Sequence, residues 1–300
     1  MSTSVPLKKL TNYRTTLAVT RTLVYILLGI LAIICILPFW VMIVNSTRTN
    51  NEILSGVTLL PGSHMIDNFK TLILGKMDLI TGVRREGLNI PRGFLNSLFI
   101  ALCATGLSGY VGALTGYAFA LYNFRGKKIL WGIILTVLMV PPTVGLIGYY
   151  KLVSGLNMID TYWPLILPAA ANPFAVFFLR NYISSSLSIS LVEAARIDGA
   201  KELYVFNRIA LPLAMPGIAT ISILGFLGSW NNYLLPLIVL NDKNLYTMPL
   251  QIQQLNTSLY NRDFGALYMG IALSVIPILA FFAFFSRYLI EGISAGSVKE

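Results

Sequence analysis

The chain has 300 residues, of which 56% are hydrophobic and only 11% charged, and its mean hydropathy is +0.72. A soluble domain carries about 25% charged residues. The 11% in this chain could not cover the surface of a soluble domain, so a soluble globular protein is excluded. The net charge of +10 is compatible with nucleic acid or anionic lipid until the charges are placed. Two cysteines inside apolar runs and a single histidine exclude a disulfide framework and a zinc cluster.

Six stretches are long and apolar enough to cross a bilayer as helices, because a hydrocarbon core of about 30 Å takes ~20 apolar residues. They are residues 22–44, 94–122, 129–149, 162–179, 213–240 and 266–286. None of them contains Lys, Arg, Asp or Glu. The strands of a membrane β-barrel would be about 10 residues long and alternating. We therefore expect an all-α integral membrane protein with six transmembrane helices.

The first span is predicted to be a retained anchor, because its 23 apolar residues exceed the about 7–15 of a signal-peptide core. No small-residue cleavage site follows it. The spans divide the rest of the chain into segments. These are an N-terminal tail (1–21), the first helix (22–44), a long loop (45–93), a core with five helices (94–286) that includes a loop at 180–212, and a C-terminal tail (287–300).

Six spans place both termini on one side of the membrane. The segments on that side carry 13 Lys and Arg against five acids, whereas the segments on the other side carry nine against seven. Short loops rich in Lys and Arg stay in the cytoplasm, so we expect both termini to be cytoplasmic and 45–93 to be external. The net positive charge is therefore an orientation signal. The expected surroundings are lipid, without nucleic acid.

Proline and small residues are frequent in the spans. A helix broken by proline in lipid usually lines a cavity or buries its break in protein, and Pro141, Pro142 and Pro173 are such positions. Small residues such as Gly112 and Gly116 allow neighbouring helices to approach closely. Ordinary helix packing explains any single one of these residues. Together they favour a bundle with moving helices over an inert anchor.

The loop 180–212 is the one sizeable loop on the expected cytoplasmic side. Ser190 and Glu193 have the spacing of a capping box, which predicts that a helix begins there. Asp198-Gly199 predicts a sharp turn, because Gly199 can adopt positive φ. A second short helix carries apolar residues along one face: Leu203, Phe206 and Ile209. Such an exposed helix-turn-helix with a partly apolar face needs a partner.

A sequence pattern runs through this loop: Glu193-Ala194-Ala195, Asp198-Gly199-Ala200, Phe206 and Leu211-Pro212. It resembles the EAA loop of binding-protein-dependent ABC importer permeases, and it lies between the fourth and fifth spans, where that family has it. The resemblance implies the type I ABC importer permease fold and a multi-pass location in the bacterial inner membrane. It also implies a coupling helix seated in a cleft of a separate ATPase. The residues expected to contact that ATPase or to support the turn are Glu193, Ala194, Ala195, Asp198, Gly199, Ala200 and Phe206.

Two further features are similar to the carbohydrate-importer permeases that include the smaller maltose permease. One is the tail from Glu291 to Lys299, and the other is Tyr246-Thr247 followed by Gln253-Gln254. The resemblance covers most of 94–300. The loop 45–93 has no counterpart in the pattern, and its role stays open.

A sugar is a neutral polyol, so its pathway needs hydrogen-bonding groups and aromatic rings rather than buried charges. The candidates implied by the family comparison are Trp230, Asn231, Asn232 and Tyr233 inside the fifth span, with Asn172 and Phe174 beside Pro173 in the fourth. Hydrogen bonds between helices are the alternative role for these asparagines.

The polar loop around 251–263 is the last external segment. By the same resemblance it contacts the substrate-binding protein, through Gln253, Gln254, Asn256 and Tyr260. A solvated loop is the equally open alternative.

No energy source is visible in the chain, because the phosphate-binding pattern G-x-x-x-x-G-K-[ST] is absent. We therefore expect no enzyme activity and no cofactor in this chain, with ATP and Mg²⁺ bound by a partner ATPase. The expected partners are a second homologous permease, two copies of the ATPase and an extracytoplasmic sugar-binding protein. The alternative function is an ion-coupled secondary transporter of a neutral solute, which would usually carry ionisable residues in its spans.

Overall fold

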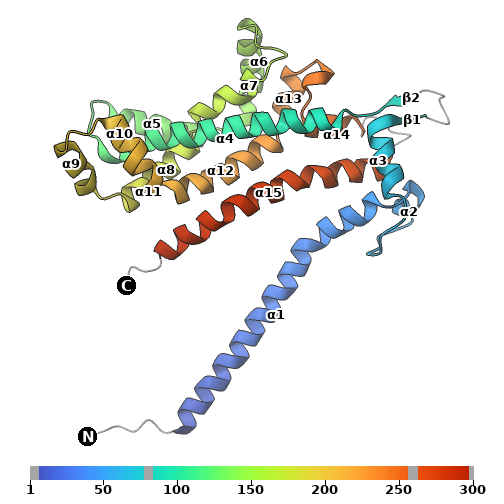
Figure 1. Cartoon of the computed structure of the whole chain (residues 1–300), viewed down its shortest axis with the longest axis horizontal. Coiled ribbons are helices and arrows are strands. Elements are labelled where there is room, and N and C mark those ends of the chain that lie inside the picture. The colour runs from blue at the N-terminus through green and yellow to red at the C-terminus, as the bar shows by residue number, and fades with distance from the viewer. Residues whose placement is uncertain (1–6, 78–83, 256–262, 297–300) are drawn as a thin grey trace. The chain divides into compact units, whose positions relative to one another are not determined.

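The computed structural model describes residues 7–77, 84–255 and 263–296, and most of them are helical (Figure 1). Two three-residue strands, β1 (Gly75–Met77) and β2 (Arg84–Glu86), pair antiparallel with Gly75 opposite Glu86. The expected helical class is confirmed. The chain divides into two units, residues 1–72 with 263–272 and residues 73–262 with 273–300.

Four helical segments are long and apolar enough to cross a membrane. They are Leu17–Ser46, Ile90–Leu121, Trp163–Ser186 and Phe264–Ser286. Two further pairs of helices pass the same test only together, because each pair is sharply bent at a short break. The described part of the chain therefore holds between four and six spans, depending on whether each bent pair crosses as one.

The first unit contains α1 (Leu7–Ser46), α2 (Asn50–Leu54), most of α3 (Met65–Leu74) and the start of α15 (Phe264–Gly296). Large apolar side chains of α1 are exposed from Leu17 to Trp40. Pro38 lies inside this helix without ending it. So long an apolar surface suits lipid or the apolar face of another membrane subunit.

The segment after α1 is held by a buried polar cluster. The Asn68 side chain donates to the carbonyl oxygens of Ser46 and Arg48 at 2.8 and 2.9 Å. Arg48, only 8% exposed, donates to neutral oxygens, including the Gly56 carbonyl at 3.1 Å. Gly265 at the start of α15 fits against Asn68, where a Cβ would lie 2.4 Å from the amide oxygen. Part of the loop left unexplained by the sequence is thus a folded cap on this unit.

The second unit is built around α4 (Ile90–Leu121), which packs against α8 (Pro173–Ser186) and α12 (Met215–Trp230) (Figure 1). Glycines of α4 allow this approach. A Cβ at Gly112 would lie 2.9 Å from the Ala175 Cβ, and one at Gly116 would lie 2.8 Å from the backbone nitrogen of Arg180. The predicted close helix packing in the second span is therefore confirmed at these glycines.

The third predicted span, 129–149, is not one straight helix. It is divided into α5 (Lys127–Leu138) and α6 (Leu146–Gly155), which meet at 88° around the short 3₁₀ turn Pro142–Gly145. Proline lacks the backbone N–H that the helix needs, and its ring clashes with the preceding turn. The consecutive prolines Pro141 and Pro142 therefore account for the break.

The fourth predicted span, 162–179, lies within a longer helical segment. It is built from α7 (Trp163–Ile166), the 3₁₀ segment Leu167–Ala171 and α8, which ends at Ser186. Asn172 is the N-cap of α8, and Pro173 occupies its first helical position, where a missing N–H costs nothing.

The fifth predicted span, 213–240, is wrong as a single helix. The helix α12 ends at Trp230, and a separate helix, α13 (Leu234–Val239), follows. At its other end α12 meets the segment Glu202–Leu213 at 77°. A 3₁₀ turn (Lys243–Leu245), α14 (Met248–Gln254) and α15 complete the order of elements.

Candidate functional site

The helix-turn-helix begins with α9 (Ile189–Ile197). The capping box predicted at Ser190 and Glu193 is not formed, because Ser188 is the N-cap and Ser190 already lies in the first turn. The two serine hydroxyls lie 2.7 Å apart and bond to each other. The third helical residue after Ser188 is Leu191, whose side chain cannot return a capping hydrogen bond.

The sharp turn predicted at Asp198-Gly199 is confirmed. Asp198 ends α9, and Gly199 adopts the left-handed conformation with φ +80°. The Gly199 N–H donates to the Arg196 carbonyl and the Ala200 N–H donates to the Ala195 carbonyl, both at 3.0 Å. This pair of bonds is a Schellman motif, which closes a helix through a left-handed residue.

The inner side of the helix-turn-helix is part of the hydrophobic core. After the turn, α10 (Glu202–Val205) continues into a π-helical segment, Phe206–Ala210, and α11 (Leu211–Leu213). Phe206 is 1% exposed, and its ring centroid lies 5.4 Å from that of Tyr117 and 5.8 Å from that of Tyr110 on α4. The sequence left two roles open for Phe206, contact with the ATPase and support of the turn. Its buried position favours support of the turn.

The outer side of the helix-turn-helix is exposed. Glu193, Ala194, Asp198 and Gly199 are exposed, while Ala195 and Ala200 are half-buried. Large apolar side chains accompany them: Ile189, Leu191, Ile197, Leu203 and Tyr204. Leu203 does not share the buried face of Phe206 as expected, since it is 62% exposed. Small, charged and apolar groups side by side form a surface suited to a protein partner.

Trp230, the first candidate for the pathway, is buried in the core of the second unit. It is 1% exposed, and its indole N–H donates to the Ser274 carbonyl of α15 at 3.0 Å. Its ring stacks on Phe226 and meets Phe94 edge-on. The sequence shows that Trp230 is aromatic, but only the packing shows that both its ring and its donor are already used.

The residues after Trp230 lie at a helix end rather than inside a span. Asn231 is the C-cap of α12 and is exposed. Asn232 accepts a hydrogen bond from the Leu235 N–H at 3.3 Å. Tyr233 packs against the cluster of Val153, Val239, Leu240 and Leu250. Asn231 is the member of this set whose side chain is most accessible.

The second pair of candidates surrounds Pro173. The Asn172 amide oxygen accepts from the N–H groups of Phe174 and Ala175 at 3.1 and 3.2 Å, and its nitrogen donates to the Ser108 hydroxyl at 3.0 Å. Asn172 therefore caps α8 and ties it to α4, which matches the alternative of a helix–helix hydrogen bond. The Phe174 ring is 43% exposed and remains accessible.

The candidates in the last external segment are only partly described. Gln253 is exposed and Gln254 is half-buried at the end of α14, whereas Asn256 and Tyr260 lie outside the described residues. Sequence reasoning missed Gln251, which is 3% exposed and packs against Gly93 of α4. The sequence signal for this contact is the small residue Gly93, and it can be recognised only once the fold places Gly93 beside Gln251.

Asp160 joins two connecting segments of the second unit that are far apart in sequence. Its carboxylate accepts from the backbone N–H groups of Asn241 and Asp242, the latter at 2.9 Å. These donors lower the pKa of Asp160 below its ordinary value. The residue itself adopts φ +56°, a conformation that Asp tolerates better than most residues do.

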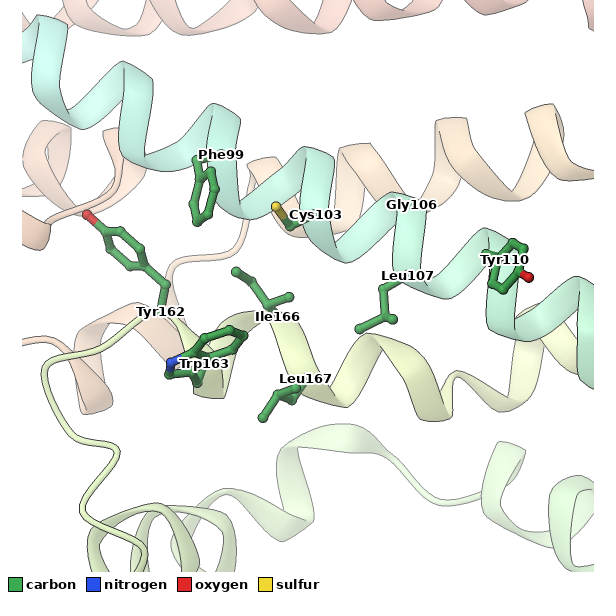
Figure 2. A pocket seen from close by; sticks show the side chains of 9 residues that line it. All are labelled: Phe99, Cys103, Gly106, Leu107, Tyr110, Tyr162, Trp163, Ile166 and Leu167. Atoms are coloured by element: carbon green, nitrogen blue, oxygen red, sulfur yellow. The ribbon is translucent and has the colours of Figure 1, made fainter.

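An apolar pocket of about 710 Å³ lies between α4 and the segment Tyr162–Leu167 (Figure 2). Figure 2 shows its lining: Phe99, Cys103, Gly106, Leu107, Tyr110, Tyr162, Trp163, Ile166 and Leu167. Very few polar atoms face this space, so it suits apolar groups better than a polyol. Within the described residues, no three His, Cys, Asp or Glu side chains are placed to share a metal ion.

Residues 108–294 match the family described as binding-protein-dependent transport system inner membrane component. The chain belongs to this family. It is the inner-membrane permease subunit of an ABC importer, as its resemblance at the EAA loop implied. A binding-protein-dependent permease of an ABC importer implies an ATPase and a substrate-binding protein as partners.

Relatives with assigned names match over nearly the whole chain. The arabinooligosaccharides transport system permease protein AraQ of Bacillus subtilis is 34% identical, over 90% of this chain and 92% of that protein. The lactose transport system permease protein LacG of Rhizobium radiobacter is 30% identical, over 92% and 95%. A chain of a bacterial ABC transporter involved in alginate import, known from its crystal structure, has a TM-score of 0.71 at 21% identity and covers 96% of this chain and 99% of that chain. This last likeness shows that the fold is shared.

Proposed function

We propose that this permease subunit imports a sugar of the oligosaccharide class. The names of the two relatives support a sugar, and so do the family-like tail and the Tyr246-Thr247 and Gln253-Gln254 features. Spans 22–44 and 94–122, like the other four, lack Lys, Arg, Asp and Glu, which favours a neutral cargo. The chain itself then catalyses no reaction.

The observation that carries the coupling role is the exposed turn of the helix-turn-helix. Gly199 closes α9 without a side chain, and apart from its two chain neighbours no atom of the described residues would lie within 4 Å of a Cβ there. A partner can therefore approach the backbone of the turn closely. Glu193, Ala194 and Asp198 surround this point, and we assign to it the contact with the ATPase.

The proposed assembly pairs this chain with a second homologous permease, two ATPase copies and an extracytoplasmic sugar-binding protein. ATP and Mg²⁺ bind to the ATPases, and this chain holds no cofactor. ATP-driven closure of the ATPases moves the two coupling loops together as rigid bodies and turns the cavity outward to accept the sugar. ADP release then returns the cavity to the cytoplasm.

The proposed topology has six spans and two cytoplasmic termini, with each bent helix pair crossing once. Single-cysteine labelling tests it in a chain whose Cys35 and Cys103 are replaced by serine. A cysteine at position 208 should react only with a reagent that enters the cytoplasm, and one at position 244 should react from outside. Reaction of both from the same side would contradict this topology.

For the pathway, the accessible candidates are Asn231 and Phe174, while Trp230 is withdrawn because it is buried. Asn232 and Tyr233 directly follow Asn231 and position the chain between α12 and α13. We assign the binding-protein contact to the end of α14, where Gln253 is exposed. Alanine at Asn231 should weaken uptake, whereas alanine at the exposed Asn181 should not.

Uptake of labelled cargo by cells that lack and regain the gene tests the proposal. A panel of neutral oligosaccharides, lactose and an acidic uronate oligosaccharide separates neutral from charged cargo. We expect a neutral oligosaccharide to depend on the gene and on ATP, but not on the proton gradient. Uptake that is lost when the proton gradient is abolished, while ATP is maintained, would contradict an ATP-driven importer.

A further inference from the structure

The helix-turn-helix is held to α4 by three polar side chains that touch one another in a closed triangle. The Arg196 Nε donates to one carboxylate oxygen of Glu202 at 2.8 Å, across the turn between α9 and α10. The Tyr122 hydroxyl, directly after α4, donates to the other oxygen of Glu202. The Arg196 guanidinium lies 5.2 Å from the centre of the Tyr122 ring, within the range of a cation–π contact.

The triangle stands on an aromatic base. The Tyr122 ring meets Tyr117 edge-on at 5.8 Å, and Tyr117 in turn packs against Phe206 at 5.4 Å. The Lys127 ammonium donates to the Tyr122 carbonyl at 2.7 Å and so joins the start of α5 to the same point. Arg196 before the Asp198-Gly199 turn and Glu202 after it therefore both contact Tyr122 at the end of α4.

These contacts matter because α4 and the helix-turn-helix are far apart along the chain, so only side-chain contacts join them directly. Tyr122 and Glu202 are 80 residues apart in the sequence. By contrast, α8 runs into α9 through Leu187 and Ser188, and α10 reaches α12 only through the π-helical segment and the 77° bend. π-helical turns occur frequently at functional sites. Here the π-helical segment and the 77° bend interrupt the helical path from α10 to α12, whereas the triangle contacts α4 directly.

We infer that Tyr122, Arg196 and Glu202 form a clamp that makes α4 move with the coupling loop. They are positioning residues, and the inference rests on the proposed function, because it requires an ATPase to displace the loop. The arginine and glutamate side chains are 38% and 51% exposed. Exposed ion pairs add little to stability, so the effect of the clamp should be on coupling rather than on folding.

The test uses the complete importer reconstituted in lipid, with uptake and ATP hydrolysis measured together. Tyr122→Phe keeps the ring and removes the hydroxyl, and Glu202→Gln keeps the shape and removes the charge. Each should lower the sugar transported per ATP by about fivefold, with the ATPase subunits still recovered as in the wild type. The double variant should be no worse than Glu202→Gln alone, because that change already weakens the contact with the Tyr122 hydroxyl as well as the ion pair with Arg196.

The control is Arg208→Ala, an exposed cation on the same loop outside the triangle. It should transport as the wild type does, while Arg196→Ala should not, and Arg196→Lys should restore only part of the loss. Wild-type transport per ATP in Tyr122→Phe and Glu202→Gln, or additive losses in the double variant, would overturn the clamp.

Hydrogen exchange on the purified chain separates this inference from the proposed function. Glu202→Gln should speed exchange of the backbone amides at 199–203 by about threefold relative to wild type. Unchanged exchange would overturn the clamp, whether or not an ATPase binds. If purification of the wild-type chain recovers no ATPase, the proposed function is contradicted, even where the exchange data show that the clamp holds the loop.

Discussion

Gly199 combines two properties that can be separated by mutation. Its backbone is left-handed, which glycine adopts freely and asparagine tolerates. It also lacks a side chain at a point where this chain leaves open space. The first property closes α9, and the second allows a partner to approach.

Gly199→Asn should therefore preserve the turn and still disturb coupling. We expect the Ala200 amide, which bonds to Ala195, to keep its wild-type exchange rate, while uptake falls because the new side chain meets the ATPase. Gly199→Val should lose both the protected Ala200 amide and uptake, since a β-branched residue strains the left-handed conformation by roughly 1–2 kcal/mol. Wild-type uptake by Gly199→Asn would show that no partner packs closely on the turn.

The pathway candidates show what residue type alone leaves open. Trp230, Asn231, Asn232 and Tyr233 are adjacent, and the sequence offers the same aromatic and amide chemistry at each end of the run. Only the end of α12 decides that Trp230 points into the core and Asn231 outward. For Asn172 the sequence left two roles, and its hydrogen bonds in the cap of α8 support the structural one.

At the scale of elements, close packing of α4 depends on individual glycines. Gly116→Ala should destabilise the protein by about 1–3 kcal/mol, because the new methyl group meets the backbone of Arg180. In Gly106→Ala on the same helix, the new methyl group would meet no described atom within 4 Å beyond its chain neighbours and the backbone of its own helix, so the change should be neutral or stabilising by up to about 1 kcal/mol. Unfolding in detergent measures both, and equal stability of the two variants would contradict the packing.

Asp160 provides a pH-dependent contact between two connecting segments. Hydrogen bonds lower its pKa in the folded state, so the contact contributes above the unfolded pKa and is lost as pH falls through the lower folded value. At neutral pH it is fully present. Asp160→Gly keeps a residue that tolerates positive φ and removes the acceptor oxygen, to which both N–H groups donate. It should speed amide exchange at Asn241 and Asp242 by about tenfold at neutral pH; unchanged exchange would argue against the contact.

Apolar length and charge placement predicted the helical class and the regions that hold the long apolar helices, because both are local properties. They did not predict the short helices α2 and α3 in the 45–93 loop. The breaks were harder. Pro141-Pro142 marks one in the sequence, but Pro38 and Pro277 lie inside continuous helices. The end of α12 at Trp230 has no proline signal, and it depends on what the next residues pack against. The sequence likewise favoured Ser190 as the start of the coupling-loop helix because of its spacing from Glu193, whereas the structure has Ser188 as the N-cap.

At the scale of the whole molecule, this chain presents surfaces that call for other subunits. The outer side of the helix-turn-helix is exposed and partly apolar, and α1 exposes apolar side chains along most of its length. The Phe206 core and the clamp give the first of these surfaces a rigid backing. A permease subunit that receives force at one loop and delivers it to packed helices needs this combination.

The central claim is that this chain works as the permease of an ATP-driven importer with two ATPase copies. Mild-detergent purification through a tag on this chain, with subunits identified and counted by mass spectrometry, tests it most directly. The account predicts recovery of one other homologous permease and two copies of an ATPase. Recovery of this chain alone, or as a homo-oligomer without an ATPase, would contradict it.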